Sequence, residues 1–276
     1  MTKKTASSPA LVTPVVRALR LLRYIAEGGS TANTSEVGRL IQVNRVTVSR
    51  LLTTLEAEGL IQALPQGGHQ VATGFLRLAA NCLAEHDLLA AGRRVAAALS
   101  QQFSLSVYLV LPNQLDVMYV LRHMPEEGLV SRIRLGSQMP AYLTAPGRAM
   151  LATLSEASLK TLFANHRYQA NLPSQPDNWR SLSEQISRDR QAQCVWSFSG
   201  LEEGINACGA AILDGQQRAV AGLSVVGPAY RFEKNKQLEQ AVTEQVQQAA
   251  DDLTQVALVD GVFRPSFSAT SDVSGE

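Results

Sequence analysis

The sequence predicts an α+β fold divided into two domains. The chain has 276 residues, and single domains typically contain about 100–200. The N-terminal part up to Gly59 shows only the apolar spacing of amphipathic helices. The rest alternates helical stretches with short apolar runs around turn residues, which is typical of helices that flank an antiparallel sheet.

The first predicted helix has Thr13 as its N-cap and Pro14 at its first position. Gly28 and Gly29 end it. Its apolar residues recur at helical spacing and predict one buried stripe, formed by Val15, Ala18, Leu19, Leu22, Ile25 and Ala26.

Two further helices follow with a tight turn between them. The second begins near Thr34 or Ser35 and is predicted to bury Val37, Leu40 and Ile41. After a turn at residues 42–44, Asn44 is a good N-cap for the third helix, which Gly59 ends. The predicted buried stripe of this third helix consists of Val48, Leu51, Leu52 and Leu55. This is the layout of a helix-turn-helix.

The front of the third helix differs from its rear, because its first turns carry cationic and hydroxyl side chains. A recognition helix places its N-terminal residues in the major groove of DNA. There arginine binds guanine through two hydrogen bonds, hydroxyls bond to bases or phosphates, and methyl groups contact thymine. We therefore predict five DNA-binding residues and leave open which of them read bases: Arg45, Val46, Thr47, Ser49 and Arg50.

A β-hairpin is predicted after Gly59, with segments 60–63 and 69–72 around Pro65–Gly68, as in the wing of a winged helix. Residues 1–80 hold 9 Lys/Arg and 4 Asp/Glu, whereas the remainder holds 16 and 20. A basic unit beside an acidic one favours DNA binding. A winged helix that binds only a protein partner remains the alternative, and the salt dependence of DNA affinity distinguishes the two.

The later part of the chain is predicted to form helices around an antiparallel sheet. The predicted strands are 105–111, 115–121, 129–133, 207–213 and 220–226, the last two around the hairpin turn Asp214-Gly215. The predicted helices are 75–85, 88–102, 146–164, 179–192 and 231–259.

Nothing in the sequence predicts catalysis, a cofactor or a bound metal ion. No nucleophile elbow, phosphate-binding loop or metalloprotease motif occurs, and neighbouring carboxylates such as Glu202 and Glu203 point apart on a strand. An enzyme whose C-terminal part catalyses is a weaker alternative. Three widely spaced cysteines, Cys82, Cys194 and Cys208, predict buried thiols in a reducing cytoplasm.

Two late strands carry small residues on one face each. By alternation, Ile205, Ala207 and Gly209 share a face, as do Gly222, Ser224 and Val226. Small side chains on adjoining faces leave room for a ligand. They also let a helix pack closely, and the sequence alone leaves both interpretations open.

Three stretches together resemble one known family. VSRLLTTLEAEGLIQ (48–62), PAYLTAPGRAMLATL (140–154) and GINACGAAILDGQQRAVAGLSVVGP (204–228) resemble the IclR family of bacterial transcriptional regulators, over residues 13–260. The resemblance implies operator DNA as a partner, a GAF-like domain that binds a small-molecule effector, and dimers that pair into tetramers. It also implies control of neighbouring catabolic genes.

These expectations divide the chain into five segments. The terminal segments 1–12 and 261–276 are predicted to be disordered. Between them we expect a winged helix-turn-helix domain at 13–74, a linker helix at 75–86 and the effector-binding domain at 87–260.

The resemblance also implies which residues contact the effector. The predicted set is Thr144, Ser197, Ile205, Ala207, Ser224 and Val226, with Asn206 and Arg134 as weaker candidates. Ser197 stands where some family members carry Asp, Ala207 where some carry Cys, and Val226 replaces a second serine. Fewer polar groups favour a larger, less polar or aromatic ligand over a small keto acid.

Overall fold

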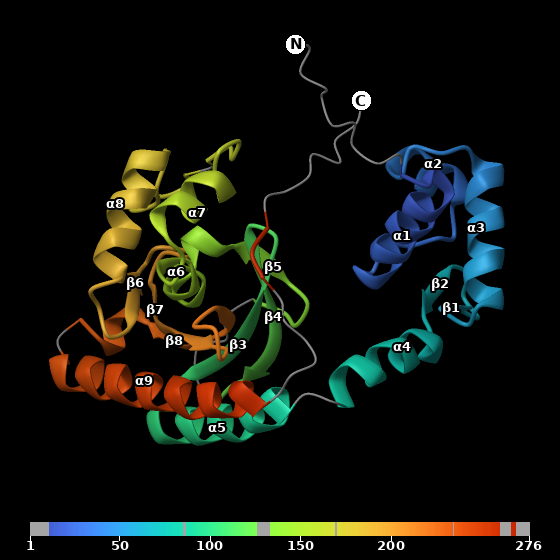
Figure 1. Cartoon of the computed structure of the whole chain (residues 1–276). Helices are drawn as coiled ribbons and strands as arrows, with labels where there is room; N and C mark the ends of the chain where they lie inside the picture. Colours follow the sequence, from blue (N-terminus) through green and yellow to red (C-terminus); the bar gives the residue numbers. More distant parts are fainter. Residues whose placement is uncertain are drawn as a thin grey trace, which may run out of the picture. The chain divides into compact units, whose positions relative to one another are not determined.

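The computed structural model describes residues 11–84, 87–125, 133–168, 170–233, 235–259 and 266–268. The chain forms two compact units, residues 1–84 and 85–276, and each is described by itself (Figure 1). The predicted arm, apart from Leu11 and Val12, and the predicted strand 129–133, apart from Ile133, lie outside the described residues. The fold is α+β, as the sequence predicts.

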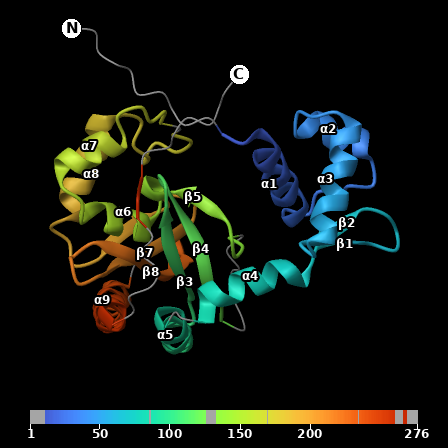
Figure 2. The same ribbon diagram turned by 45° about the vertical axis from the view of Figure 1, so that its right-hand side comes forward.

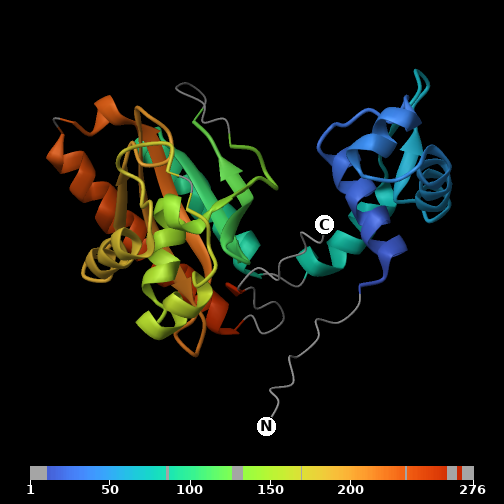
Figure 3. The same ribbon diagram turned by 90° about the horizontal axis from the view of Figure 1, so that it is seen from above.

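The N-terminal unit contains helices and a two-stranded hairpin that protrudes from them (Figure 3). Its elements are α1 (Thr13–Ala26), α2 (Thr34–Leu40), α3 (Arg45–Ala57), β1 (Ile61–Ala63), β2 (His69–Val71) and α4 (Thr73–Ala84). The strands pair antiparallel, with Ile61 opposite Val71. The first three helices and the hairpin share one apolar core, which includes Leu21, Val37, Val48 and Ile61.

The predicted buried stripe of the first helix is correct at Leu22 and Ile25 and wrong at Val15, Leu19 and Ala26. Leu21, Leu22 and Ile25 face the core, whereas Val15 and Leu19 are 55% and 48% exposed. Apolar residues surround much of α1, so periodicity alone does not select the stripe that meets the other helices.

Two more details of these helices differ from the sequence-based expectation. The N-cap of α1 is Val12, not Thr13, and no side chain bonds to the helix end; Pro14 lies in the first turn. Leu40 is 59% exposed because α2 ends there and its buried side is formed by Val37 and Ile41.

The C-terminal unit is built on a six-stranded antiparallel sheet with the order β5-β4-β3-β8-β7-β6. Its strands are β3 (Ser106–Asn113), β4 (Asp116–His123), β5 (Gln138–Pro140), β6 (Val195–Phe198), β7 (Ile205–Leu213) and β8 (Ala219–Pro228). The sequence did not predict β5 and β6, which have only three and four residues.

Helices cover both faces of this sheet, as Figures 1 and 2 show. On one face, α5 (Asp87–Phe103) and the long α9 (Lys236–Val259) pack on the sheet and form with it an apolar layer that includes Leu109, Leu223 and Val246. The opposite face carries α6 (Ala145–Ala152), α7 (Glu156–Leu162) and α8 (Trp179–Asp189). A second apolar layer lies beneath these helices.

Two predicted helices are shorter or divided in the structure. The single helix predicted at 146–164 is two helices, because Ser155 caps a new one: its Oγ accepts a hydrogen bond from Ser158 N at 3.1 Å. The final helix begins at Lys236 rather than Arg231, since residues Ala229–Arg231 form a 3-10 turn.

Part of the C-terminal tail contacts the sheet, which departs from the expectation of a disordered segment. Phe267 forms an isolated parallel bridge with Gln114, and Ser268 N donates to Gln114 O at 3.2 Å. The Phe267 ring is half-buried against the apolar layer beneath α6, α7 and α8. Burial of this ring accounts for the attachment.

Candidate DNA-recognition helix and effector cavity

The front of α3 is exposed and its first turn is capped. Asn44 Oδ1 accepts a hydrogen bond from Thr47 N at 2.8 Å, which fixes the start of the helix as predicted. Of the five predicted DNA-binding residues, Thr47 is half-buried and the other four are exposed, with Val46 at 69%. Val48, Leu52 and Leu55 are buried behind them.

The cationic side chains at this front take no part in the fold. Within the described part of the chain, no hydrogen bond or ion pair engages the guanidinium of Arg45 or Arg50. Ser49 Oγ donates to Arg45 O at 3.3 Å, so this hydroxyl rests against its own helix while its lone pairs stay exposed. The charges are therefore available to an anionic partner.

The wing is held against the helices by polar contacts. Thr31 Oγ1 lies 2.8 Å from His69 Nδ1, which joins the loop before α2 to the second strand. Glu56 Oε1 accepts from Ala63 N at 3.3 Å and ties the end of α3 to the first strand. The hairpin and α3 thus have a fixed mutual geometry within this unit.

In the C-terminal unit, all six predicted effector residues line a single cavity. They come from three separate stretches of the chain, at 144, at 197 and at 205–226. Six further residues that were not predicted as effector contacts complete the lining: Tyr119, Ile133, Ala145, Pro146, Leu201 and Glu202.

The register of the sheet explains this convergence. Ala207 lies directly opposite Val226 on one side and Ser197 on the other. Gly209 pairs with Ser224, so these side chains share one face of three adjacent strands. The small residues of β7 and those of β8 therefore lie on the same face of the sheet.

One end of this small-residue face receives the start of α6. A methyl group on Gly209 would lie 2.5 Å from Pro146 N, and one on Gly222 would lie 2.9 Å from Pro146 Cβ. Both interpretations left open by the sequence thus hold at different positions. The glycines allow close helix packing, whereas Ala207, Ser224 and Val226 line the cavity.

Thr144 combines cavity lining with a structural role. Its Oγ1 accepts from Gly147 N at 3.1 Å as the N-cap of α6 and donates to Ala141 O at 3.3 Å. These bonds fix the helix end that closes the cavity.

A buried arginine anchors the same helix from its other side. Arg148 donates to Trp196 O and forms an ion pair with Asp189, with Nε and Oδ2 3.3 Å apart. Burial lowers the pKa of Arg148 and raises the pKa of Asp189, while the attraction between the two charges opposes both shifts. The pair therefore holds α6, α8 and β6 together around the cavity.

The ring of Tyr119 lines the cavity on the β4 side. Tyr119 is 3% exposed and its ring meets Tyr108 edge to face, with centroids 5.4 Å apart. Burial, and then the neighbouring Tyr108, raise the pKa of the Tyr119 hydroxyl, so it remains protonated and can donate a hydrogen bond. The free volume of the cavity is about 30 Å³, room for about two water molecules.

The two weaker effector candidates lie elsewhere. Asn206 Oδ1 accepts from Ser199 N at 3.1 Å and lines a different depression, because neighbouring strand residues face opposite sides. Arg134 is exposed and does not line the cavity. Among the thiols, Cys194 and Cys208 are buried as predicted, and the side chain of Cys82 lies outside the described residues.

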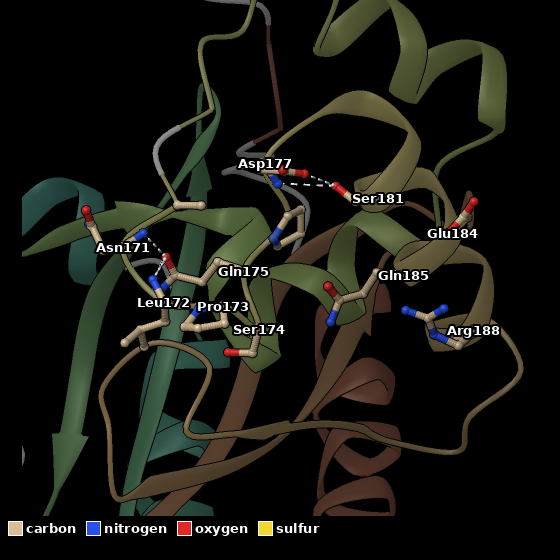
Figure 4. A pocket seen from close by; sticks show the side chains of 12 residues that line it. Asn171, Leu172, Pro173, Ser174, Gln175, Asp177, Ser181, Glu184, Gln185 and Arg188 are labelled. Carbon is tan, nitrogen blue, oxygen red and sulfur yellow. Dashed lines mark hydrogen bonds between the residues drawn. The ribbon is translucent and has the colours of Figure 1, made fainter.

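A larger groove lies beside α8, and its lining is mostly polar (Figure 4). Its volume is about 530 Å³, between residues 170–177 and one face of the helix that carries Ser181, Gln185 and Arg188. None of the predicted effector residues lines it. We therefore take the smaller cavity, where the predicted residues meet, as the candidate effector site.

Among the described residues, no group of three or more His, Cys, Asp or Glu side chains is placed to hold a metal ion. No described helix is long and apolar enough to cross a membrane.

Comparison with known proteins decides the family. Residues 80–255 match the family described as bacterial transcriptional regulator IclR C-terminal, and residues 14–65 match the IclR helix-turn-helix domain. The chain belongs to the IclR family. Members of this family are ligand-responsive, DNA-binding transcriptional regulators, and this chain is therefore a transcriptional regulator of the IclR type.

Individual relatives are distant but extend over most of the chain. The transcriptional repressor IclR of Escherichia coli is 24% identical over 240 residues, covering 85% of this chain and 87% of the relative. The regulator TtgV of Pseudomonas putida is 27% identical over 230 residues, 81% of this chain and 85% of TtgV.

A solved structure supports the fold. The crystal structure of an IclR homolog complexed with 4-hydroxybenzoate, from Microbacterium hydrocarbonoxydans, superposes with a TM-score of 0.77 at 16% identity. The match covers 88% of this chain and 98% of the homolog.

Proposed function

We propose that this regulator binds operator DNA through the front of α3 and a small aromatic or other organic acid in the cavity beside α6. The proposal assigns residues 13–74 to DNA binding, 75–86 to a linker helix and 87–260 to effector binding. It places the chain in the cytoplasm, where operator DNA is found, and assigns it regulation rather than catalysis, with neighbouring catabolic genes as its targets.

The convergence of six predicted residues on one cavity carries this proposal. Thr144, Ser197 and Ser224 come from three distant parts of the chain, and each was expected to contact an effector. Sites that bind small molecules are concave, mostly apolar and supplied with a few placed polar groups. The cavity has this composition, with hydroxyls at four of its residues and the carboxylate of Glu202 among apolar side chains.

The lining favours an aromatic acid over a small keto acid. Tyr119, Ile133 and Leu201 add apolar and ring surface to the predicted set. The N-terminal end of α6 also borders the cavity, and the partial positive charge of a helix N-terminus favours a carboxylate. The 4-hydroxybenzoate bound by the homolog from Microbacterium hydrocarbonoxydans is a ligand of this class.

We propose that the regulator acts as a dimer or as a pair of dimers. A single helix-turn-helix reads one half-site, so two copies are needed on a pseudo-palindrome. The N-terminal unit exposes apolar side chains that its own core leaves uncovered, and such patches favour association. They include Val15 and Leu19 on α1 and Leu76 on α4.

Effector binding is tested by calorimetric titration with 4-hydroxybenzoate, benzoate and pyruvate. We expect the aromatic acids to bind more tightly than pyruvate. Ser224→Leu fills the cavity and should abolish binding while operator affinity is retained. Undiminished binding to this variant would place the effector elsewhere.

DNA binding is tested by operator affinity measured at several salt concentrations. Each phosphate contact lowers the logarithm of the binding constant by about 0.9 for each unit of log salt. Several contacts therefore predict a steep dependence. A flat response would favour a protein partner for the N-terminal unit.

A further inference from the structure

The candidate effector cavity is nearly closed, and part of its wall is the loop between β6 and β7. Leu201 and Glu202 belong to this loop and line the cavity. The free volume of about 30 Å³ is about a tenth of the 300 Å³ found in small ligand pockets. A ligand of the proposed class therefore enters only if part of the wall moves.

The loop, residues 199–204, is closed on itself by hydrogen bonds and can move as one piece. Ser199 N donates to Ile205 O at 3.0 Å, and Gly204 N donates to Ser199 Oγ at 3.1 Å. At the end next to β7, Gly204 O accepts from Ala229 N at 2.8 Å. The middle of the loop, next to Leu201, is held by a different contact.

That contact is the side chain of Gln175, which is 8% exposed. Its Nε2 donates to Gly200 O at 2.8 Å. Its Oε1 accepts from Asn171 N at 2.7 Å and from Leu172 N at 3.3 Å, the two bonds drawn in Figure 4. One buried carboxamide thus joins two loops that are distant in sequence, and each of its polar atoms is used.

The second loop has space on its other side. Residues 170–177 border the groove of about 530 Å³, which separates them from α8 (Figure 4). The groove leaves one side of this loop without packed neighbours, whereas α6 is fixed by the buried pair of Arg148 and Asp189. Of the two sides of the cavity, the side held by Gln175 is the one free to open.

We propose that Gln175 is a positioning residue of the effector cavity: its carboxamide holds loop 199–204 shut, and loss of the bond to Gly200 opens the cavity. The inference rests on the proposed function, because that function assigns the cavity to an effector. Its tests need no effector. They can therefore succeed or fail independently of whether the cavity binds an effector.

The first test is amide hydrogen exchange in the ligand-free protein. Gln175→Ala removes the bond to Gly200, and the amides of Ser199, Gly204 and Ile205 should exchange about tenfold faster. Amides of α3 and of the centre of β7 should be unchanged. The matched control is Gln185→Ala, which removes an amide side chain from the same groove and should leave the loop unaffected.

A second variant keeps this test decisive if Gln175→Ala lowers the stability of the whole unit. Gln175→Glu retains an acceptor for Asn171 N and Leu172 N, and in its ionised form it has no donor for Gly200 O, so exchange is measured at a pH at which the carboxylate is ionised. The same local acceleration is expected, while amides in the centre of β7 stay protected and show that the unit is folded. Unaltered exchange of the three loop amides in this variant would overturn the proposal.

The second test measures access to the cavity directly. Ser224→Cys places a thiol in the cavity lining, in a chain that also carries Cys82→Ser and retains its two buried thiols. A small aromatic disulfide reagent should label this thiol about tenfold faster when Gln175→Glu is added. Equal labelling rates with and without the Gln175 change would show that the cavity opens by another route.

Discussion

The front of α3 and the lining of the effector cavity contain similar polar side chains, but the fold uses them differently. On α3, Arg45 and Arg50 are exposed, and no hydrogen bond or ion pair among the described residues engages their guanidiniums. Thr144 lines the cavity, but its hydroxyl also caps α6. Gly209 also admits the backbone of α6.

This difference teaches which substitutions report on function alone. A side chain without a structural role can be replaced at little cost in stability, since exposed surface changes usually alter it by less than about 0.5 kcal/mol. A side chain with two roles changes folding and binding together. Substitutions on α3 should therefore leave stability unchanged, whereas most cavity substitutions should not.

The largest expected effect is on the cavity side, at Gly209. In Gly209→Ala the new methyl group meets the backbone of Ala145 and Pro146 at 2.5–2.7 Å, and backbone atoms cannot rotate away. We expect the free energy of unfolding of the C-terminal unit to fall by about 3 kcal/mol in denaturant titrations.

The control for this prediction is Gly215→Ala in the turn between β7 and β8. There the nearest atom, on the Leu258 side chain, would lie 3.6 Å from the new methyl group, an ordinary contact. Its effect should stay below about 0.5 kcal/mol. Equal effects at the two glycines would mean that α6 does not pack on Gly209.

The second prediction concerns the other side of the comparison. Arg50→Ala should weaken specific operator binding by about 2 kcal/mol if this side chain reads a base, as measured by electrophoretic shift. The melting temperature should not change. Arg180→Ala on exposed α8 is the matched control, and unchanged operator affinity for Arg50→Ala would remove Arg50 from the interface.

The third prediction separates the two roles of Thr144. Thr144→Ala removes the cap of α6 and should lower the free energy of unfolding by about 1 kcal/mol. Thr144→Ser keeps the hydroxyl and should restore most of this stability in thermal unfolding. If both variants were as stable as the parent chain, the hydroxyl would have no capping role.

Local signals in the sequence predicted most of the fold. Asn44 as a cap, Gly59 as a helix end and the turn at Asp214 each act within a few residues, and the structure has all three. The predicted buried face of α1 was wrong at Val15 and Leu19, because the packing of α2 and α3 decides which apolar side of α1 is covered.

The candidate site was predictable only in part for a related reason. Ile205, Ala207 and Ser224 lie on two strands joined by a recognisable turn, so alternation places them on one face. Tyr119 joins them from β4, two strands away from β8, and no local pattern fixes that strand order. Its alternation with Val117 could have indicated a buried face, but not which cavity it meets.

The smallest expected effect concerns Tyr108, where the comparison is sharpest. Its ring is fully buried, and its hydroxyl has no hydrogen-bond partner among the described residues. Like the guanidinium of Arg50, the Tyr108 hydroxyl has no structural role. Unlike that guanidinium it is buried, and a buried hydroxyl without a hydrogen bond lowers stability. Tyr108→Phe retains the edge-to-face contact with Tyr119. The Tyr108→Phe variant should have a free energy of unfolding higher by up to about 1 kcal/mol in denaturant titrations. A lower stability would instead mean that the hydroxyl is hydrogen-bonded in solution, and Tyr108 would then resemble Thr144, whose hydroxyl has a structural role, rather than Arg50.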